Sequence, residues 1–186
     1  MIGLIVSVIL AGIIVILFIL WLVFMLDSIA LGHDLPTDKK QIKILFDIIN
    51  EQKVARTFYD LGCAHGSLAV RIKRKFPYLT VCAIDNDSVR IFFAKIRAFI
   101  LRKKVNFICA DILKTDLSQA DILYTYLWYD IMPPLEQKLQ KELKPGALVI
   151  TNTSSFPNWK PIKTIEPEKR SEQKVNIETL FIYRKE

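Results

Sequence analysis

Three aspartates and a glycine-containing turn stand where predicted strands end. Asp60 opens the sequence Asp60-Leu-Gly-Cys-Ala-His-Gly66. Gly62 and Gly66 allow the backbone to turn sharply and to approach a ligand without interference from a Cβ atom. The free N–H groups at the start of the following helix attract an anion, and Asp60 favours a cation nearby. An anion site beside a carboxylate suits a zwitterionic amino-acid group better than a pyrophosphate.

Two further acids extend this pattern. Asp85 lies 19 residues past Gly66 (85 − 66), where a carboxylate can accept hydrogen bonds from both hydroxyls of a ribose. Asp111 follows the next strand and could accept the exocyclic amine of adenine. Each feature alone has an ordinary alternative, since Asp85 could cap the helix starting near Ser88 and Asp111 could be a loop acid. Their joint order favours a nucleoside and amino-acid site, and the turn lacks the G-x-G-x-x-G pattern of nicotinamide sites.

Alternating predicted strands and helices position these residues. Apolar runs rich in Val, Ile and Cys alternate with amphipathic segments of helical period. The predicted strands are 57–61, 80–84, 105–109, 121–127 and 147–151, and the predicted helices are 38–52, 66–76, 88–102 and 134–143. A last strand is predicted at 178–184, with a segment near 162–165 beside it. This alternation implies an α/β fold whose parallel sheet is covered on both faces and binds ligands at the carboxyl ends of its strands.

The first 26 residues contain no charged side chain. A run of roughly 20 apolar residues is enough to span a bilayer as a helix. A cleaved signal peptide is the alternative. The run is longer than an ordinary apolar h-region, no basic residues precede it and no A-x-A-like site follows it. Lys39, Lys40 and Lys43 follow the span, which places the remaining domain on the cytoplasmic side by the positive-inside rule, at the inner membrane if the source is bacterial.

The net charge of +7 belongs to the part after this segment. Basic runs at 71–75 and 102–104 suit either a solvated helix face or contact with anionic lipid headgroups. Nucleic acid is not expected, because no recognition motif is present. The three cysteines, Cys63, Cys82 and Cys109, are expected to be small buried residues, and the two histidines are too few to suggest a metal site.

On these motifs, the chain resembles class I S-adenosylmethionine-dependent methyltransferases over residues 37–186. The family's fold is a Rossmann-like, mostly parallel sheet of seven strands whose last strand is antiparallel. The resemblance implies S-adenosyl-L-methionine as cofactor, with these cofactor-binding residues: Asp60, Gly62, Ala64, Gly66, Asp85 and Asp111. Ala64 replaces the usual middle glycine, which a close approach tolerates if its φ stays negative. His65 replaces an acidic residue and could contact the cofactor region or be an exposed loop residue.

A narrower resemblance concerns three other segments. The anchor followed by Leu35-Pro36-Thr37, the run 132–147 beginning Met-Pro-Pro-Leu-Glu, and Ser155-Phe-Pro-Asn-Trp159 are similar to one group of membrane-anchored protein-lysine methyltransferases. Those enzymes act on the ATP-synthase c-subunit or the adenine-nucleotide translocase. The resemblance implies a lysine of an integral membrane protein as methyl acceptor.

The acceptor side is expected at the ends of the fourth and fifth strands. Tyr129 and Asp130 are the candidate catalytic residues, with Asp130 orienting an amine. The candidates for the substrate channel are Trp128, Asn152, Phe156 and Trp159. Core packing is the alternative role for these aromatic residues. The absence of an Asn-Pro-Pro-Tyr sequence counts against methylation of base amino groups.

The sequence thus predicts a transmembrane anchor at 1–26, a linker at 27–37 and a methyltransferase domain at 38–186. The expected partners are the lipid bilayer and an integral membrane protein substrate. Two other hypotheses remain: a methyltransferase of a membrane lipid or quinone, and a cofactor-binding membrane scaffold without catalysis.

Overall fold

A computed structural model describes residues 1–30, 37–166 and 179–186 of the chain. The chain divides into two compact units, residues 1–35 and residues 36–186. The predicted residues Leu35, Pro36 and Glu178 lie outside the described ranges. The domain boundaries inferred from sequence therefore stay predictions.

The first unit contains one long helix, α1 (Ile2–Ala30). Its segment Ile2–Met25 is long and apolar enough to cross a membrane. A signal sequence near an N-terminus can also meet this criterion of length and composition, so the helix by itself does not decide between the two.

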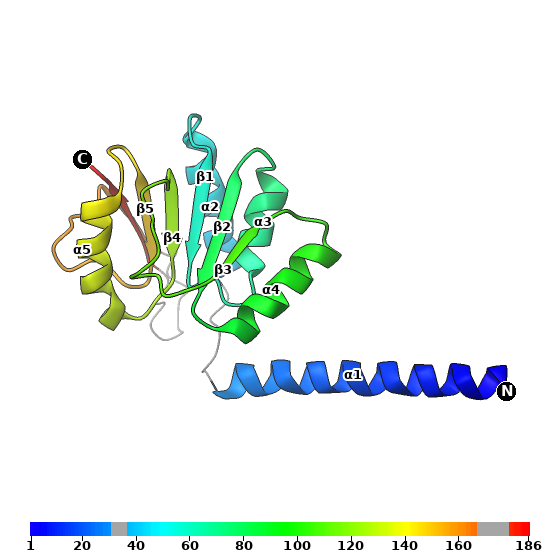
Figure 1. Cartoon of the computed structure of the whole chain (residues 1–186). Helices are drawn as coiled ribbons and strands as arrows, with labels where there is room; N and C mark the ends of the chain where they lie inside the picture. The colour runs from blue at the N-terminus through cyan, green and yellow to red at the C-terminus, as the bar shows by residue number, and fades with distance from the viewer. Residues whose placement is uncertain (31–36, 167–178) are drawn as a thin grey trace, which may run out of the picture. The chain divides into compact units, whose positions relative to one another are not determined.

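The second unit is an α/β domain built on a seven-stranded sheet of order β3-β2-β1-β4-β5-β7-β6 (Figure 1). The strands are β1 (Thr57–Leu61), β2 (Thr80–Asp85), β3 (Asn106–Cys109), β4 (Ile122–Thr125), β5 (Leu148–Asn152), β6 (Lys163–Ile165) and β7 (Leu180–Arg184). Strands β1 to β5 are parallel, and β7 is antiparallel to both of its neighbours. This is the mostly parallel sheet with an antiparallel last strand that the resemblance to class I methyltransferases implied.

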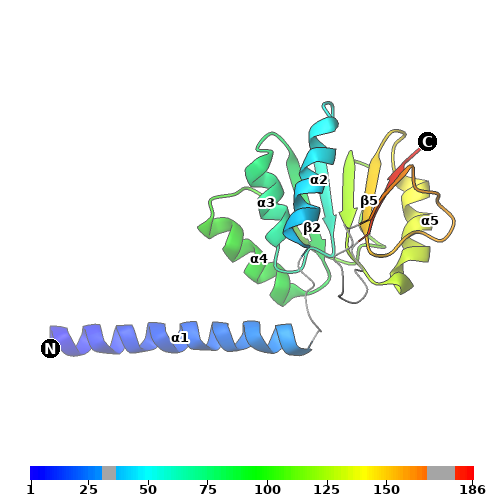
Figure 2. The same ribbon diagram turned by 180° about the vertical axis from the view of Figure 1, so that it is seen from behind.

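Two apolar layers cover the sheet. The helices are α2 (Lys39–Glu51), α3 (Ser67–Lys75), α4 (Ser88–Ile100) and α5 (Met132–Glu142), with a short 3-10 turn, η1 (Tyr129–Ile131), before α5. Helices α2, α3 and α4 pack with Phe58 on one face, whereas α5 packs with Tyr59 and Leu61 on the other. Alternate residues of β1 therefore fill opposite cores, as the pleat of a strand requires. Helix α2 crosses in front of the sheet in Figure 2.

The structure corrects three details of the sequence prediction. Strand β4 ends at Thr125, where its pairing with Leu61 of β1 ends, instead of at Leu127. Helix α5 begins two residues earlier than predicted, at Met132 (134 − 132). Cys63 and Cys82 are buried as expected, but Cys109 is exposed because β3 is the edge strand.

Asp121 joins the amino ends of β1 and β4. Its carboxylate accepts hydrogen bonds from the backbone N–H groups of Arg56 and Thr57 at 2.7 and 2.8 Å, and Lys144 forms an ion pair with it. Burial alone would raise the pKa of Asp121, but Lys144 and these donors hold it at about 2. The native state therefore favours the ionised carboxylate.

The Asp121→Asn variant should lose about 2 kcal/mol of unfolding free energy at pH 7, because charge-assisted hydrogen bonds are lost. Since the folded pKa lies below the ordinary value, this contribution is present above that value and disappears as the pH falls toward 2. Thermal unfolding across the acid range should show wild type and variant converging at low pH. The Glu51→Gln control makes the same charge change at an exposed site and should keep the wild-type acid dependence.

Candidate functional site

The turn between β1 and α3 is tied to the end of β2. Gly62 and Cys63 donate backbone hydrogen bonds to the Ile84 carbonyl at 2.9 and 3.0 Å. Ala64 N–H donates to Asp85 Oδ2 at 2.8 Å. These bonds hold the turn against the carboxyl end of the neighbouring strand, where a parallel sheet binds its ligands.

Gly66 is required by both its backbone and its surroundings. Its φ is +68°, and a Cβ atom there would lie 2.7 Å from the Phe107 ring and 2.9 Å from the Ala94 methyl. Gly66 is also the N-cap of α3 and supplies no side-chain acceptor. The first N–H groups of α3 are therefore available to an anion, as the sequence predicted.

Two expectations about the middle of the turn need correction. Ala64 has φ +46°, not the negative φ that an alanine prefers, because its N–H must point at Asp85. His65 is buried, so the exposed-loop alternative is wrong, and its ring contacts Phe93 at a centroid distance of 6.2 Å. Both replacements keep the turn compact, and Ala64 does so under backbone strain.

Asp60 is the most buried acid of the candidate site. It is only 3% exposed, and the backbone N–H of Ala69, in the first turn of α3, donates to its carboxylate. Among the described residues, no donor lies within hydrogen-bond distance of Asp60 Oδ2. Burial, and then the nearby charge of Asp85, raise the pKa of Asp60 to about 7. A buried oxygen without a partner is costly, so this atom suits a cationic ligand group.

Asp85 and Asp111 lie at the ends of β2 and beyond β3, but their surroundings differ. Asp85 is buried and accepts from Ala64 and from the backbone of Asp87, while Asp87 itself caps α4. The capping alternative for Asp85 is therefore wrong. Asp111 accepts from Leu113 N–H at 2.8 Å and forms an exposed ion pair with Lys114. Asp85 keeps spare lone pairs for a ribose, whereas Asp111 first orders its own loop.

The predicted acceptor residues after β4 are exposed. Trp128 and Tyr129 are 72% and 78% exposed, so core packing does not explain them. Asp130 follows them in η1 and is also exposed. These side chains are open to a partner at the carboxyl edge of the sheet.

The segment after β5 is bound to the same edge. Ser154 Oγ donates to the Leu127 carbonyl at 2.9 Å, which brings the ends of β4 and β5 together. Between them Thr153 has φ +71°, a strained value for a β-branched residue. The sequence does not indicate this strain, because threonine, unlike glycine or asparagine, is not typical of a left-handed backbone.

Asn152, Phe156 and Trp159 lie deeper than the other acceptor candidates. Asn152 is fully buried and donates to Tyr124 Oη at 3.3 Å. Phe156 and Trp159 stack at 5.6 Å, and both contact the Tyr183 ring. The aromatic pair forms part of the core on the α5 face. Its role in a substrate channel stays a prediction.

Tyr124 was missed by the sequence analysis. Its hydroxyl lies 3.0 Å from Thr37 Oγ1 and accepts from Asn152, while burial raises its pKa. It joins the chain just before α2 to the ends of β4 and β5. A tyrosine within an apolar strand is expected to be a core residue, so the polar contact of its hydroxyl is seen only in the folded structure.

Comparison with known proteins places this geometry in a family. The model of the ANTKMT methyltransferase domain matches residues 60–163, from Asp60 of the turn to the start of β6. The chain belongs to this methyltransferase family. It is an S-adenosylmethionine-dependent methyltransferase, as its sequence motifs predicted.

Individual relatives are distant. A protein-lysine N-methyltransferase of Saccharolobus islandicus is 23% identical over 137 residues, which cover 72% of this chain and 83% of that protein. A carboxy-S-adenosyl-L-methionine synthase of Wolinella succinogenes is 31% identical over 114 residues, but the match spans 56% of this chain and 47% of that protein. An RNA methyltransferase structure from Salinibacter ruber, with S-adenosyl-L-homocysteine, has a TM-score of 0.70 and 21% identity, and the match covers 81% of this chain and 93% of that one. That likeness shows the shared fold.

The methyltransferase site fits its cofactor, S-adenosylmethionine. The capless start of α3 can receive a carboxylate, and the unpaired Asp60 oxygen can receive an ammonium group. Both groups occur in one amino-acid moiety. Tested against the residues present, the cofactor therefore satisfies both of these polar features.

The Ala64→Gly variant should be neutral or up to about 1 kcal/mol more stable, because relief of the left-handed backbone offsets the greater freedom of the unfolded glycine. Chemical denaturation measures this change. The Ala110→Gly control, at a residue whose φ is not positive, should be destabilised. Equal losses in the two variants would contradict strain at Ala64.

The affinity for S-adenosylhomocysteine should rise with pH and level off near pH 7. The ammonium group binds ionised Asp60, and the free protein keeps this carboxyl protonated up to its raised pKa. Below that pKa the dissociation constant should change by up to about tenfold per pH unit. Calorimetric titration checks the slope, which should vanish in Asp60→Asn and persist in Asp111→Asn. A flat wild-type profile would contradict the assignment.

Proposed function

We propose that this methyltransferase is a membrane-anchored protein-lysine N-methyltransferase whose substrate is a membrane protein. The observation that carries the proposal is the family match across residues 60–163, which contain the candidate site. The Saccharolobus relative is a protein-lysine N-methyltransferase. The apolar segment Ile2–Met25 supplies a candidate anchor.

Six residues form the proposed cofactor side. Asp60 pairs with the ammonium group, and the Gly62–Gly66 turn with the start of α3 receives the carboxylate. Asp85 accepts from the ribose hydroxyls while it holds Ala64, which couples the shape of the turn to nucleoside binding. Asp111 accepts from the adenine amine on the exposed side of the site. The members of this set are Asp60, Gly62, Ala64, Gly66, Asp85 and Asp111.

The acceptor side is proposed at the exposed end of β4. A lysine ammonium with an ordinary pKa near 10.4 must lose a proton before it can react. Trp128 and Tyr129 offer aromatic surface that can cover the lysine side chain and exclude water from its amine. Asp130 orients the amine by hydrogen bonding. The buried Asn152 stabilises the ends of β4 and β5 by donating a hydrogen bond to Tyr124.

The bound cofactor supplies an electrophilic methyl group on a sulfonium. The lone pair of the lysine nitrogen forms the new N–C bond as the C–S bond breaks. The electron pair of the broken C–S bond stays on sulfur. The product is the methylated lysine ammonium, so the one proton released is the proton that left the substrate amine before the attack. The protein contributes orientation and exclusion of water more than covalent chemistry.

The domain is proposed to lie on the cytoplasmic side. Lys39, Lys40 and Lys43 are exposed and follow the apolar helix closely in sequence. A positive charge excess beside a span favours the cytoplasmic side. That side also contains the soluble cofactor.

Membranes incubated with methyl-labelled cofactor and the full chain test the proposal. Label in a membrane protein band, mapped to a lysine by mass spectrometry, is the expected result. The Asp85→Ala variant should abolish labelling, because it releases the turn and removes the ribose acceptor. The Asp47→Ala control removes an exposed acid of α2 and should label normally.

The other outcomes separate the alternatives. Label in the lipid extract would indicate a lipid or quinone methyltransferase. Cofactor binding without any label would indicate a non-catalytic scaffold. Undiminished labelling by Asp85→Ala would overturn the assignment of the cofactor site.

A further inference from the structure

Helices α3 and α4 form an outer surface without acidic residues. Their sequences, SLAVRIKRK and SVRIFFAKIRAFI, contain seven lysines and arginines together and no aspartate or glutamate. We call the surface formed by Arg71, Arg74, Lys75 and Arg97 the basic face. It lies on the layer of helices α2, α3 and α4, which covers one face of the sheet.

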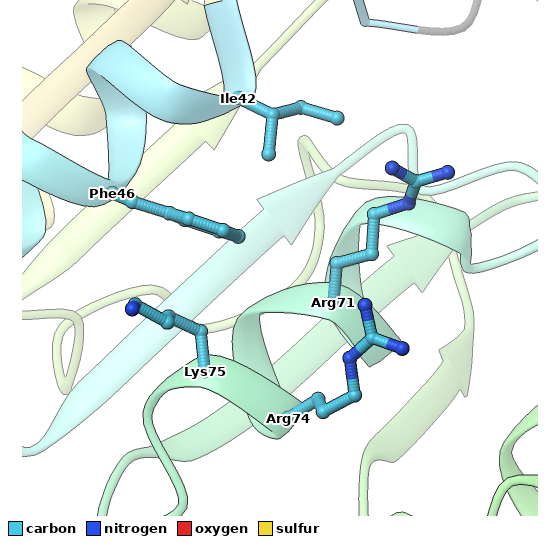
Figure 3. Close-up of a pocket in the computed structure, with 5 residues that line it drawn as sticks. All are labelled: Ile42, Phe46, Arg71, Arg74 and Lys75. Atoms are coloured by element: carbon cyan, nitrogen blue, oxygen red, sulfur yellow. The ribbon is translucent and has the colours of Figure 1, made fainter. Parts of the chain in front are cut away.

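A cavity of about 320 Å³ lies between α2 and α3 in this face (Figure 3). Arg71, Arg74 and Lys75 extend from α3 toward the side where Ile42 and Phe46 of α2 lie. The cavity therefore combines three cations with an apolar wall. Such a lining suits an anionic group attached to an apolar chain.

A second cavity, of about 230 Å³, continues the face between α3 and α4. Arg71 and Arg74 line this one too, together with Arg97 and Leu101 of the α4 end. The Nε atom of Arg97 is buried, and no described residue accepts its hydrogen bond. The two arginines of α3 thus stand between two hollows, each with its own further cation.

No carboxylate neutralises these cations within the described ranges. The ion pairs seen there involve Asp111, Glu142 and Asp121, none of which pairs with the basic face. Like charges gathered on one face repel each other and attract an external anion. The basic face is therefore electrostatically suited to bind a partner with negative charge.

An exposed apolar tip adjoins the basic face. Phe99 and Ile100, at the end of α4, are 84% and 69% exposed. Arg102 then takes φ +51°, which ends the helix and begins the basic run 102–104. Large exposed apolar side chains bordered by cations are typical of surfaces that enter the lipid headgroup region.

We propose that the basic face and the tip at Phe99 and Ile100 bind the surface of an anionic lipid bilayer. The arginines and Lys75 receive lipid phosphates in the two cavities, and the tip enters the boundary between headgroups and acyl chains. Nucleic acid fits less well, because Phe99 is the one aromatic residue of the tip and Ile100 cannot stack on bases as aromatic residues do. Contact with lipid along this face does not require methyl transfer, so the inference goes beyond the proposed activity.

The lipid surface would be separate from the cofactor turn. Helix α4 follows the carboxyl end of β2 and ends before the amino end of β3. Phe99 and Ile100 therefore lie at the edge of the domain opposite the strand ends that hold Asp60 and Asp85. Substitutions on the lipid surface should leave cofactor affinity unchanged.

The test uses the full chain reconstituted into vesicles of phosphatidylcholine, with and without phosphatidylserine. An environment-sensitive dye is attached at Ile100→Cys in a Cys109→Ser background, since Cys63 and Cys82 are buried. Nitroxide lipids should quench the dye fluorescence when phosphatidylserine is present. The fluorescence should recover at high salt, because the domain leaves the anionic surface. Carbonate extraction measures insertion of the N-terminal helix separately, so failed anchoring is distinguishable from failed docking.

Charge reversal gives the matched comparison. Arg71→Glu with Arg74→Glu should lower the ratio of docked to undocked domain by at least about tenfold, from the usual contribution of a cation near an anionic surface. Lys160→Glu with Lys163→Glu makes the same charge change at exposed positions just before and at the start of β6 and should leave quenching unchanged. Equal effects of the two pairs, no quenching in anionic vesicles, or preferential binding of an added oligonucleotide would each overturn the proposal.

Discussion

The hydrogen bonds between the β1–α3 turn and the end of β2 are the interaction on which the site depends. The Ile84 carbonyl receives Gly62 and Cys63, and Asp85 receives Ala64. They fix where α3 begins, and the start of α3 fixes its open N–H groups and the N–H that Ala69 gives to Asp60. One turn therefore sets both the anion site and its neighbouring acid, and a strained Ala64 is tolerated because Asp85 holds it.

The same turn places two buried carboxylates close together, and a cationic ligand group can stabilise their negative charge. Asp60 and Asp85 are both buried, and the charge of Asp85 makes ionisation of Asp60 less favourable. Asp85 has two backbone donors, whereas Asp60 keeps one oxygen without a donor among the described residues. A bound ammonium group would remove this imbalance. The proposed acceptor side contrasts with this order, since Trp128, Tyr129 and Asp130 are exposed.

The sequence predicted the α/β sheet, its helices and the place of the acids because these depend on local periodicity and on glycine spacing, whereas the antiparallel last strand was implied by the family resemblance. Strand β1 was predicted with its observed bounds, and the short β6 was found beside β7. Features that depend on contacts between distant residues were not predictable: the exposure of Cys109 on the edge strand, the positive φ of Ala64 and Thr153, and the hydrogen bonds of Tyr124. Phe156 and Trp159 could not be assigned to core or channel from their type alone.

The structure of the full chain bound to S-adenosylhomocysteine tests the central claim most directly. The ligand ammonium nitrogen is expected about 3 Å from Asp60 Oδ2. The ligand carboxylate is expected at the first N–H groups of α3, and the ribose hydroxyls are expected at Asp85. A ligand bound elsewhere, or one that leaves the Asp60 oxygen without a partner, would contradict the account.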